Sequence, residues 1–472
     1  MIRDLKPYPA YKDSGVPWLG KVPEHWLIER LKSVMSNIIQ MTRELQNGES
    51  YVALEHVESW TGRLRQAAPE VFFDSQVKRF QSGDVLFGKL RPYLAKVTRL
   101  ASDGVCVGEF FVLRPCVSNV TAPYIEQLLR SKPVIDVINS STFGAKMPRV
   151  DWQFMGGMMI PLPPVPEQIA IVRSLDHIDR RIRHSINAKQ KLIKLLEEQK
   201  QAVIHQAVTR GLDPNVRLNP SGVAWLGEVP EHWEVLPLRR RWSVTDCKHL
   251  TVPFVEEGIP LASVREVQSF NLALTTAKQT TYEWYELLVA GNRAPQRNDL
   301  IYCRNVSVGA AAFVNTNEQF AMGQDVCLIR SDNQNQRFLN YFLHSPAMGR
   351  QLAQLLVGST FDRINIAEIK GLIVVVPPKV EQDAIAAYLD ETLRNSEHLV
   401  ANINREISFL LEYRTRLIAD IVTGKLDVRV AAACLPDEAE EPEPLDDADI
   451  LTEGTEPTEG ADLEAAAGEA EA

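Results

Sequence analysis

The sequence has none of the features of a secreted, membrane-spanning or metal-scaffolded protein. Its apolar runs, such as Leu372–Val376, are far shorter than the roughly 20 residues of a membrane-spanning helix. The opening MIRDLKPYPAYKDS has no apolar segment after its basic residues, so no secretion signal is expected. The six cysteines are far apart and form no CxxC pair, which argues against a zinc ribbon and a disulfide framework. We therefore expect a cytoplasmic protein without a metal site or a membrane partner.

Motifs for nucleotide hydrolysis, DNA cleavage and methyl transfer are also absent. The segment GDVLFGKL at 83–90 is one residue short of a phosphate-binding loop, and it has Leu90 in place of the magnesium-binding hydroxyl. Pro92 follows where the helix of such a loop would run. The nuclease-like EQK at 198–200 lies inside a helical pattern, and the chain has neither a Gly-rich cofactor loop nor an Asn/Asp-Pro-Pro-aromatic site. These absences predict a chain that is not an enzyme and binds no cofactor itself.

Charge is divided unevenly along the chain. Of the 61 Asp and Glu residues, 15 lie after Leu435 with no Lys or Arg among them, which leaves 46 acids against 51 bases in residues 1–435. The protein is therefore a mildly basic body with an acidic tail rich in Ala, Pro and Gly, a composition typical of disorder. The tail is either a solvated end or an electrostatic competitor of a polyanion that binds the body.

One phrase occurs twice. SGVPWLGKVPEHW at 14–26 and SGVAWLGEVPEHW at 221–233 share eleven of thirteen residues at an offset of 207. The histidines of both copies, His25 and His232, stand beside a tryptophan in a segment punctuated by Pro and Gly. This context favours packed, hydrogen-bonded side chains over a general base. The repeat indicates two copies of one structural unit, with the phrase tying its N-terminal segment to a neighbour.

A second match predicts a long helix in each half. PLPPVPEQIAIV at 161–172 corresponds to VVPPKVEQDAIA at 375–386, and the register continues without a gap to Asp213 and Asp427. Each segment follows prolines and ends near a glycine, as helices do. At 1.5 Å per residue, 43 residues would span about 65 Å.

Apolar residues recur in both segments at alternating steps of four and three, as in a coiled-coil seam. The seam residues are Ile171, Leu175, Ile178, Ile182, Leu192, Leu196 and Val203 in the first copy and Ile385, Leu389, Leu399, Ile403, Leu410 and Leu417 in the second. Polar residues interrupt the two stripes at Ser185, Lys189, Ser396 and Glu406. We therefore expect the two helices to pair with each other inside one chain.

The segments before each helix predict strands. SGDVLFGKLRPYLAKV at 82–97 corresponds to QRNDLIYCRNVSVGAAAFV at 296–314, and GEFFVLRP at 108–115 corresponds to GQDVCLIRS at 323–331. A short helix is expected to follow in each half, and then a loop that begins with STF. The helices are expected at 124–129 and 338–343, and the loops at 141–150 and 359–369. The sequence thus predicts an α+β chain with two repeated α/β domains.

Taken together, the WLGxVPxHW phrase, DVLFGKLRPYL, the STF loops and the PxPPxxEQ start of each helix resemble the specificity subunit of type I restriction-modification systems. The resemblance covers residues 1 to about 430 and implies two target recognition domains, separated by two long antiparallel helices that form an intramolecular coiled coil. The expected boundaries are 1–164 for the first domain, 165–210 for the first helix, 211–378 for the second domain, 379–427 for the second helix and 428–472 for a disordered acidic tail.

The resemblance also implies a function in host defence. Each domain would recognise one half of a bipartite, asymmetric DNA sequence. The helices would set the spacer and recruit two methyltransferase subunits, which methylate adenine N6, and two restriction subunits would join for cleavage. S-adenosylmethionine, ATP and magnesium would belong to those partners, and the chain itself would catalyse nothing.

Basic and amide side chains of the expected loops are the candidate contacts to double-stranded DNA, because Lys and Arg bind phosphates and Arg, Asn and Gln recognise base edges. The candidates are Lys89, Arg91, Tyr93, Lys146 and Arg149 in the first half and Arg304, Asn305, Ser307, Arg363 and Asn365 in the second. The second half departs from the first, because RNVS at 304–307 replaces KLRP at 89–92. An alternative of another class is a coiled-coil scaffold for proteins that recognises no DNA sequence.

Overall fold

The computed structural model describes residues 5–46, 48–65, 76–144, 146–268, 270–356 and 363–436. The chain forms two compact units, of which unit 1 comprises residues 1–190 and 404–472 and unit 2 comprises residues 191–403. The division falls inside the two long helices rather than at their starts. The reason is that helix residues such as Ile171 and Leu175 are part of the hydrophobic core of unit 1.

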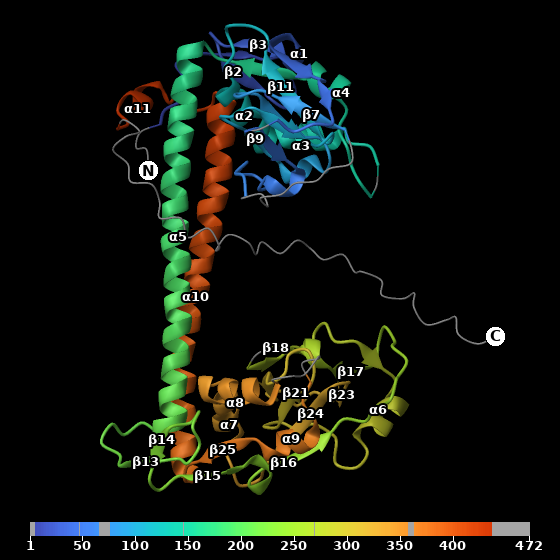
Figure 1. Ribbon diagram of the computed structural model, residues 1–472, viewed down its shortest axis with the longest axis vertical. Helices are drawn as coiled ribbons and strands as arrows, with labels where there is room; N and C mark the ends of the chain where they lie inside the picture. Colours follow the sequence, from blue (N-terminus) through green and yellow to red (C-terminus); the bar gives the residue numbers. More distant parts are fainter. Residues whose placement is uncertain are drawn as a thin grey trace, which may run out of the picture. The chain divides into compact units, whose positions relative to one another are not determined.

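Two unbroken helices, α5 (Val165–Arg210) and α10 (Lys379–Val422), have 46 and 44 residues (Figure 1). The second helix ends five residues before the expected position 427. Both are followed by a glycine with a left-handed backbone, Gly211 and Gly424, each with φ of 78°. A glycine tolerates this conformation and so ends a helix without strain.

The helices pair within each unit, as expected. In unit 1, Lys189 forms an ion pair with Glu406 and Asp179 with Arg414. Because the partner number rises as the α5 number falls, the helices run antiparallel. Two of the polar residues that interrupt the apolar stripes, Lys189 and Glu406, are thus partners of each other.

The predicted seam is correct where its residues are buried, including Ile403 near the middle of α10, and wrong at two other positions near the middle of the helices. Ile171, Leu175, Ile178 and Ile182 are buried, but Leu192 and Leu399 are about half exposed. The seam instead passes through Ile186, which is buried, and through Lys200, whose ammonium lies 3.1 Å from Glu397 in unit 2. The lysines of these polar pairs are thus mostly covered, while the carboxylates of Glu406 and Glu397 are mostly exposed.

Unit 1 contains two four-stranded sheets, ordered β5-β7-β10-β6 and β4-β11-β8-β9, and the pairs β1-β2 and β12-β3. Its strands are β1 (Tyr11–Asp13), β2 (Lys21–Pro23), β3 (Leu27–Arg30), β4 (Met35–Ile38), β5 (Met41–Thr42), β6 (Ser50–Val52), β7 (Val77–Phe80), β8 (Val85–Gly88), β9 (Val97–Arg99), β10 (Gly104–Cys106), β11 (Phe110–Pro115) and β12 (Met159–Leu162). Its further helical elements are α1 (Leu31–Val34), η1 (Leu54–His56), η2 (Pro92–Leu94), α2 (Ala122–Arg130), α3 (Lys132–Ser140) and α4 (Trp152–Gly157).

Unit 2 has a six-stranded sheet, β16-β24-β21-β22-β19-β18, a three-stranded sheet, β20-β17-β23, and the pairs β13-β14 and β15-β25. Its strands are β13 (Leu218–Pro220), β14 (Glu228–Pro230), β15 (Glu234–Pro237), β16 (Ser243–Asp246), β17 (Ile259–Ala262), β18 (Val267–Gln268), β19 (Asn271–Leu272), β20 (Gln279–Thr280), β21 (Leu300–Cys303), β22 (Ala311–Phe313), β23 (Ala321–Met322), β24 (Val326–Arg330) and β25 (Ile373–Val376). Its helical elements are η3 (Leu238–Arg240), η4 (Val264–Glu266), α6 (Tyr282–Val289), α7 (Gln336–Leu343), α8 (Pro346–Leu356) and α9 (Ile366–Gly371).

The repeat seen in the sequence is a repeat of fold. The sheet order β4-β11-β8-β9 of unit 1 corresponds to β16-β24-β21-β22 of unit 2, and β12-β3 corresponds to β15-β25. The expected short helices are α2 and α7, and each is followed by a further helix, α3 or α8, that the sequence analysis did not anticipate. A conserved order of elements therefore underlies loops of different sequence.

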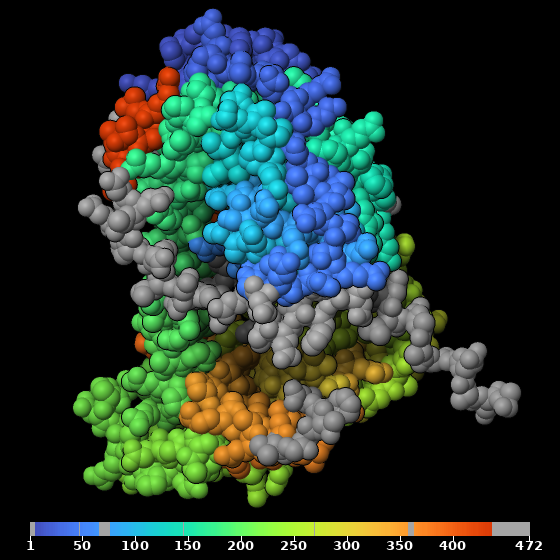
Figure 2. All heavy atoms as spheres, turned by 45° about the horizontal axis from the view of Figure 1, so that its top comes forward, coloured from blue at the N-terminus to red at the C-terminus, as the bar shows by residue number. Residues whose placement is uncertain are grey.

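The segment after α10 corrects the expected start of the tail at 428. Val428 is fully buried, Arg429–Ala433 form helix α11, and Arg173 donates to the carbonyl oxygens of Leu435 and Pro436 at 2.8 and 3.0 Å. In Figure 2 this red segment lies beside the dark-blue N-terminal residues of unit 1. Burial of Val428 and Ala432 and the hydrogen bonds of Arg173 hold this segment in unit 1. Residues 437–472, on which the disorder prediction falls, lie outside the described residues.

Among the described residues, none of the helices is both long enough and apolar enough to cross a bilayer.

Candidate nucleic-acid interface

In unit 1 the repeated phrase clamps the first turn of α5. The ring of His25 lies 2.7 Å from one carboxylate oxygen of Glu167, and the indole N–H of Trp26 donates to the other at 2.9 Å. The hydroxyl of Tyr8 donates to the same carboxylate. Burial and this hydrogen bond raise the pKa of Tyr8 well above its usual value, so Tyr8 remains a donor. The carboxylate is buried and bonded to three side chains, so it has a structural role.

Unit 2 repeats the clamp at the start of α10. His232 lies 2.7 Å from one oxygen of Glu381, and Trp233 donates to the other at 2.9 Å. The structural interpretation of both histidines is confirmed. In both units the acceptor is the glutamate of the PxPPxxEQ motif. This bond explains why the repeated phrase with its His-Trp pair and the PxPPxxEQ motif occur together in each half.

The glutamine of the same motif ties each long helix to a short one. The side-chain oxygen of Gln168 accepts from the backbone N–H of Thr121 at 2.8 Å, and the oxygen of Gln382 accepts from that of Asn335 at 2.8 Å. Thr121 and Asn335 are the N-cap residues of α2 and α7. Because α2 and α7 pack on the sheets, this bond fixes the sheet of each unit relative to its long helix.

In unit 1 the two expected loops form a short ladder. Backbone N–H groups of Arg91 and Val150 donate to the carbonyls of Pro148 and Lys89 at 2.8 and 3.0 Å. The turn after β8 and the loop before α4 are about 55 residues apart in sequence yet lie side by side. The ladder thereby brings Arg149 to the turn that carries Arg91.

All five candidates in unit 1 are at least partly exposed. Arg91, Tyr93 and Lys146 are exposed, and Lys89 is half-buried. Arg149 forms an ion pair with Glu109, with Nε–Oε2 of 3.2 Å, and its side chain is 38% exposed. Arg149 is thus partly neutralised, whereas the other cations have no acidic partner in the part of the chain that the structure describes.

Unit 2 repeats this ladder with different chemistry. The backbone N–H of Ile364 donates to the carbonyl of Arg304 at 2.9 Å, and Asn305 pairs with Arg363. Asn305 donates to Asp325 at 3.2 Å, while Arg363 lies 3.6 Å from the same carboxylate. Asp325 of unit 2 holds the position that Glu109 has in unit 1, next to the arginine of the second loop.

Two candidates of unit 2 differ from the expectation. The side chain of Arg304 is only 6% exposed and its guanidinium is paired with Asp246, so it cannot contact a ligand in this conformation. Asn365 caps α9, accepting from the N–H of Glu368 at 2.9 Å, and so has a structural role. Ser307 is exposed in the turn.

A possible cation site beside Arg304 does not suit a metal. Asp246, Cys247 and His249 place potential ligand atoms within 4.8 Å of one another. The guanidinium of Arg304 already neutralises Asp246, and burial raises the pKa of the Cys247 thiol to about 11. A thiol that stays protonated and a paired carboxylate are poor metal ligands.

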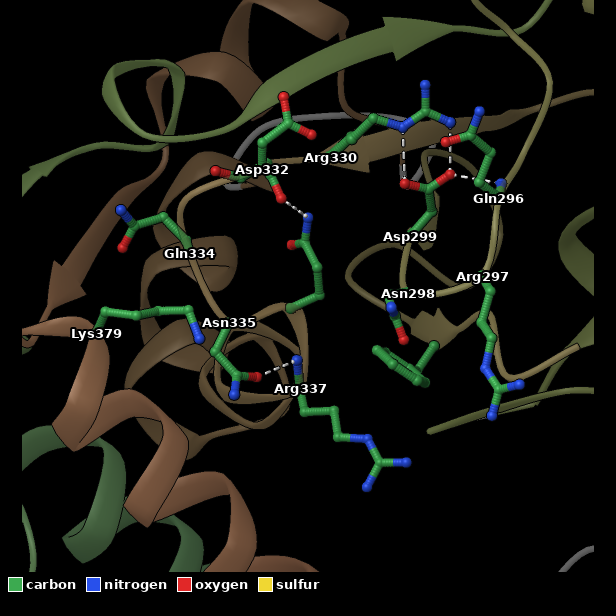
Figure 3. A pocket seen from close by; sticks show the side chains of 13 residues that line it. Gln296, Arg297, Asn298, Asp299, Arg330, Asp332, Gln334, Asn335, Arg337 and Lys379 are labelled. Carbon is green, nitrogen blue, oxygen red and sulfur yellow. Dashed lines mark hydrogen bonds and ion pairs between the residues drawn. The ribbon is translucent and has the colours of Figure 1, made fainter.

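A pocket of about 490 Å³ lies at the opposite ends of β21 and β24 from the unit 2 ladder (Figure 3). Its lining is polar, but Arg330 is held by Asp299 through hydrogen bonds of 2.8 and 2.6 Å. Arg337 and Lys379 are likewise paired with acids of α10. The Arg330–Asp299 pair joins the end of β24 to the residue before β21, the Arg337 pair joins α7 to α10, and the Lys379 pair lies within α10.

Comparison with known proteins identifies relatives of this arrangement. Residues 256–408 match the type I restriction modification DNA specificity domain. The chain is 22% identical over 435 residues to the type I restriction enzyme MjaVIII specificity subunit of Methanocaldococcus jannaschii, covering 87% of this chain and 95% of that protein.

Two solved structures share the fold. A chain from a study of complex assembly and conformational transition of the type I R-M system has a TM-score of 0.69 and 20% identity, covering 86% of this chain and 99% of that chain. The HsdS subunit of Thermoanaerobacter tengcongensis has a TM-score of 0.50 and 19% identity, covering 86% of this chain and 98% of that chain.

Proposed function

The chain belongs to the DNA specificity subunits of type I restriction-modification systems, and on this premise we propose that its two units recognise the two halves of a bipartite, asymmetric DNA site. The observation that carries the proposal is the repeated ladder. Each unit joins the turn after one central strand to the loop before a short helix, and places basic or amide side chains there. The sequences of the two ladders differ, as expected for units that recognise different half-sites.

The contacts that we assign divide by chemistry. Arg91 and Lys146, exposed and without an acidic partner among the described residues, suit phosphate oxygens, and Lys89 extends the same surface. Arg149 and Arg363, each beside an acid, have an orientation fixed enough for base edges. Tyr93, 43% exposed, offers a ring to a sugar or base, and Ser307 and Asn305 offer hydrogen bonds. Arg304 and Asn365 act by holding the unit 2 ladder in place.

The helices α5 and α10 are proposed to set the spacer and to recruit two methyltransferase subunits, through which two restriction subunits join. S-adenosylmethionine, ATP and magnesium would be bound by those subunits, and this chain would act in the cytoplasm without catalytic chemistry of its own. The clamps at Glu167 and Glu381 support this division of roles, because each fastens a recognition unit rigidly to the start of a helix.

The test uses the chain assembled with its methyltransferase subunits. Methylome sequencing of the host, with and without a deletion of the gene, should reveal a split motif with N6-methyladenine on both strands that disappears in the deletion. Duplex binding should then weaken in the double variant Lys89→Ala with Arg91→Ala. The slope of the logarithm of affinity against the logarithm of salt concentration should become less steep by about one per lost phosphate contact. Lys12→Ala with Lys21→Ala, on β1 and β2, is the matched control.

A coiled-coil scaffold without DNA recognition predicts a different result. It leaves the methylome unchanged after deletion and gives no preference for any duplex. In that case the Lys89 and Arg91 substitutions would change nothing, because there would be no sequence preference to lose.

A further inference from the structure

A hairpin of unit 1 that the sequence analysis did not single out lies beside the candidate interface. Residues 56–65 fold back on themselves, with Val57 paired to Leu64. The N–H of Glu58 donates to the carbonyl of Arg63 at 2.9 Å, and the N–H of Arg65 donates to that of His56 at 2.8 Å. The hairpin follows η1 directly and therefore starts from a fixed point.

The hairpin is docked along the turn that carries Arg91 and Tyr93. At its tip, the N–H of Trp60 donates to the carbonyl of Leu94 at 3.2 Å. At its base, the ammonium of Lys96 donates to the carbonyl of Leu54 at 2.8 Å. The backbone of this turn therefore contacts the hairpin at Leu94 and the loop at 148–150 through Lys89 and Arg91.

The tip is held in an unusual backbone conformation. Trp60 has φ of 64°, a left-handed value that costs a non-glycine residue free energy, and Gly62 has φ of 71°. A Cβ on Gly62 would lie 2.0 Å from the carbonyl oxygen of Val97, so only glycine allows this approach. The guanidinium of Arg130 also donates to the carbonyl of Thr61. These contacts over-determine the tip and keep the hairpin rigid.

Arg63 and Arg65 are presented by this rigid hairpin. They flank Leu64, which pairs with Val57 in one arm of the hairpin, so their side chains leave the same face. Both are exposed, and neither has an acidic partner among the described residues. Arg99 and Arg149 elsewhere in unit 1 are, by contrast, paired with Glu126 and Glu109.

The corresponding hairpin of unit 2 lacks both charges. Its pairing joins Val267 to Leu272, and the N–H of Ala273 donates to the carbonyl of Glu266 at 2.9 Å. This register places Asn271 where unit 1 has Arg63 and Ala273 where unit 1 has Arg65. The two units thus share the hairpin but differ in chemistry at two positions on one face, as expected of an element that distinguishes two half-sites.

We propose that Arg63 and Arg65 are base-contacting specificity determinants of the half-site recognised by unit 1, an inference that rests on the proposed function. A guanidinium that is exposed and held on a rigid strand can donate two hydrogen bonds to the O6 and N7 of a guanine in the major groove. The hairpin, the turn at 91–93 and the loop at 146–149 then form one recognition surface.

The experiment measures duplex binding by the chain assembled with its methyltransferase subunits, on the methylome-defined site and on duplexes with single base changes in each half. Arg63→Ala and Arg65→Ala are each expected to lose about 5- to 150-fold affinity for the site. The base preference should relax in one half only, the half in which Arg149→Ala, at the other base-contacting arginine proposed for unit 1, also relaxes it. Affinity for unrelated duplexes should change by less than about twofold, since few phosphate contacts are lost.

Arg30→Ala is the matched control, because Arg30 is an exposed arginine of unit 1 on β3. Arg65→Lys separates charge from geometry: it should lose base preference almost as fully as Arg65→Ala, because an ammonium cannot donate in the planar fork. Unchanged binding, or an equal loss on every duplex, would overturn the assignment to bases. If the unaltered complex showed no preference for its site, the proposed function itself would fail.

Discussion

At the scale of single residues, the two clamps share a histidine and a tryptophan but differ in burial. Glu167 has 4% of its side chain exposed and accepts from Tyr8, His25 and Trp26, whereas Glu381 is 41% exposed and accepts from two side chains. A buried carboxylate that is lost leaves its donors unsatisfied, while water replaces an exposed one.

Glu167→Ala should therefore destabilise unit 1 by about 2–4 kcal/mol. Glu381→Ala should cost unit 2 about 1 kcal/mol or less. Native-state hydrogen exchange, which reports each unit separately, measures both losses. Equal losses in the two variants would contradict the assigned difference in burial.

The residue-level predictions were correct where the repeat itself carried the information. The roles of His25 and His232 followed from their context, but the burial of Arg304 could not, because its partner Asp246 lies 58 residues away and was not singled out. Nothing in RNVS distinguishes an arginine that faces an acid of a neighbouring strand from one that faces solvent. Arg63 and Arg65 were missed because their hairpin has no motif.

At the scale of elements, the ends of the long helices pack against the tryptophans of the repeated phrase. A Cβ on Gly424 would lie 2.4 Å from Cδ of Pro23 and 3.0 Å from the ring of Trp26, whereas one on Gly211 would lie 3.2 Å from the ring of Trp233. Both glycines have left-handed backbones, so alanine is strained at either position.

Gly424→Ala should destabilise unit 1 by about 2–3 kcal/mol, and Gly211→Ala should destabilise unit 2 by about 1 kcal/mol, because only the first adds a severe clash to the backbone strain. Hydrogen exchange of the amides of each unit, measured at increasing temperature, compares the stability losses of the two variants. A smaller loss for Gly424→Ala than for Gly211→Ala would contradict the packing.

The polar pair in the helix seam gives a second prediction at this scale. Lys189→Glu and Glu406→Lys should each place like charges opposite each other and cost about 0.5–1 kcal/mol, and the double exchange should restore most of the loss. The free energy of unfolding of the unaltered protein, the two single variants and the double variant, measured in low salt, gives the double-mutant cycle. Additive losses in the double variant would show that the two side chains do not interact.

The helices themselves were predictable, because an ungapped repeat free of internal glycine and proline permits little else. Their seam was predictable only in part, since Leu192 and Leu399 continue the apolar pattern but are about half exposed, while Ile186 is buried. Short strands such as β5 and β19, with two residues each, carry too little pattern to be recognised in sequence.

At the scale of the whole molecule, the proposed function makes the helices a spacer. Four helical residues inserted after Lys191 in α5, together with four after Ile403 in α10, lengthen each helix by about 6 Å. The preferred DNA spacer should then grow by about two base pairs at 3.4 Å each. Methylome sequencing of cells with the altered chain reports the new motif, and the same four residues placed after Pro436 serve as the control. An unchanged spacer would refute this role.

The composition of the core of unit 1 has a consequence for biosynthesis. Leu417, Ile421, Val422 and Val428 complete that core, although most of unit 1 lies before residue 191. During synthesis, the N-terminal part of unit 1 therefore cannot complete its core, and keeps apolar surface exposed, until residues 417–428 have been translated. Unit 2, which is continuous in sequence, can close first. A premature stop codon between residues 404 and 417 should accordingly damage the unit that was made earliest and spare the one made after it.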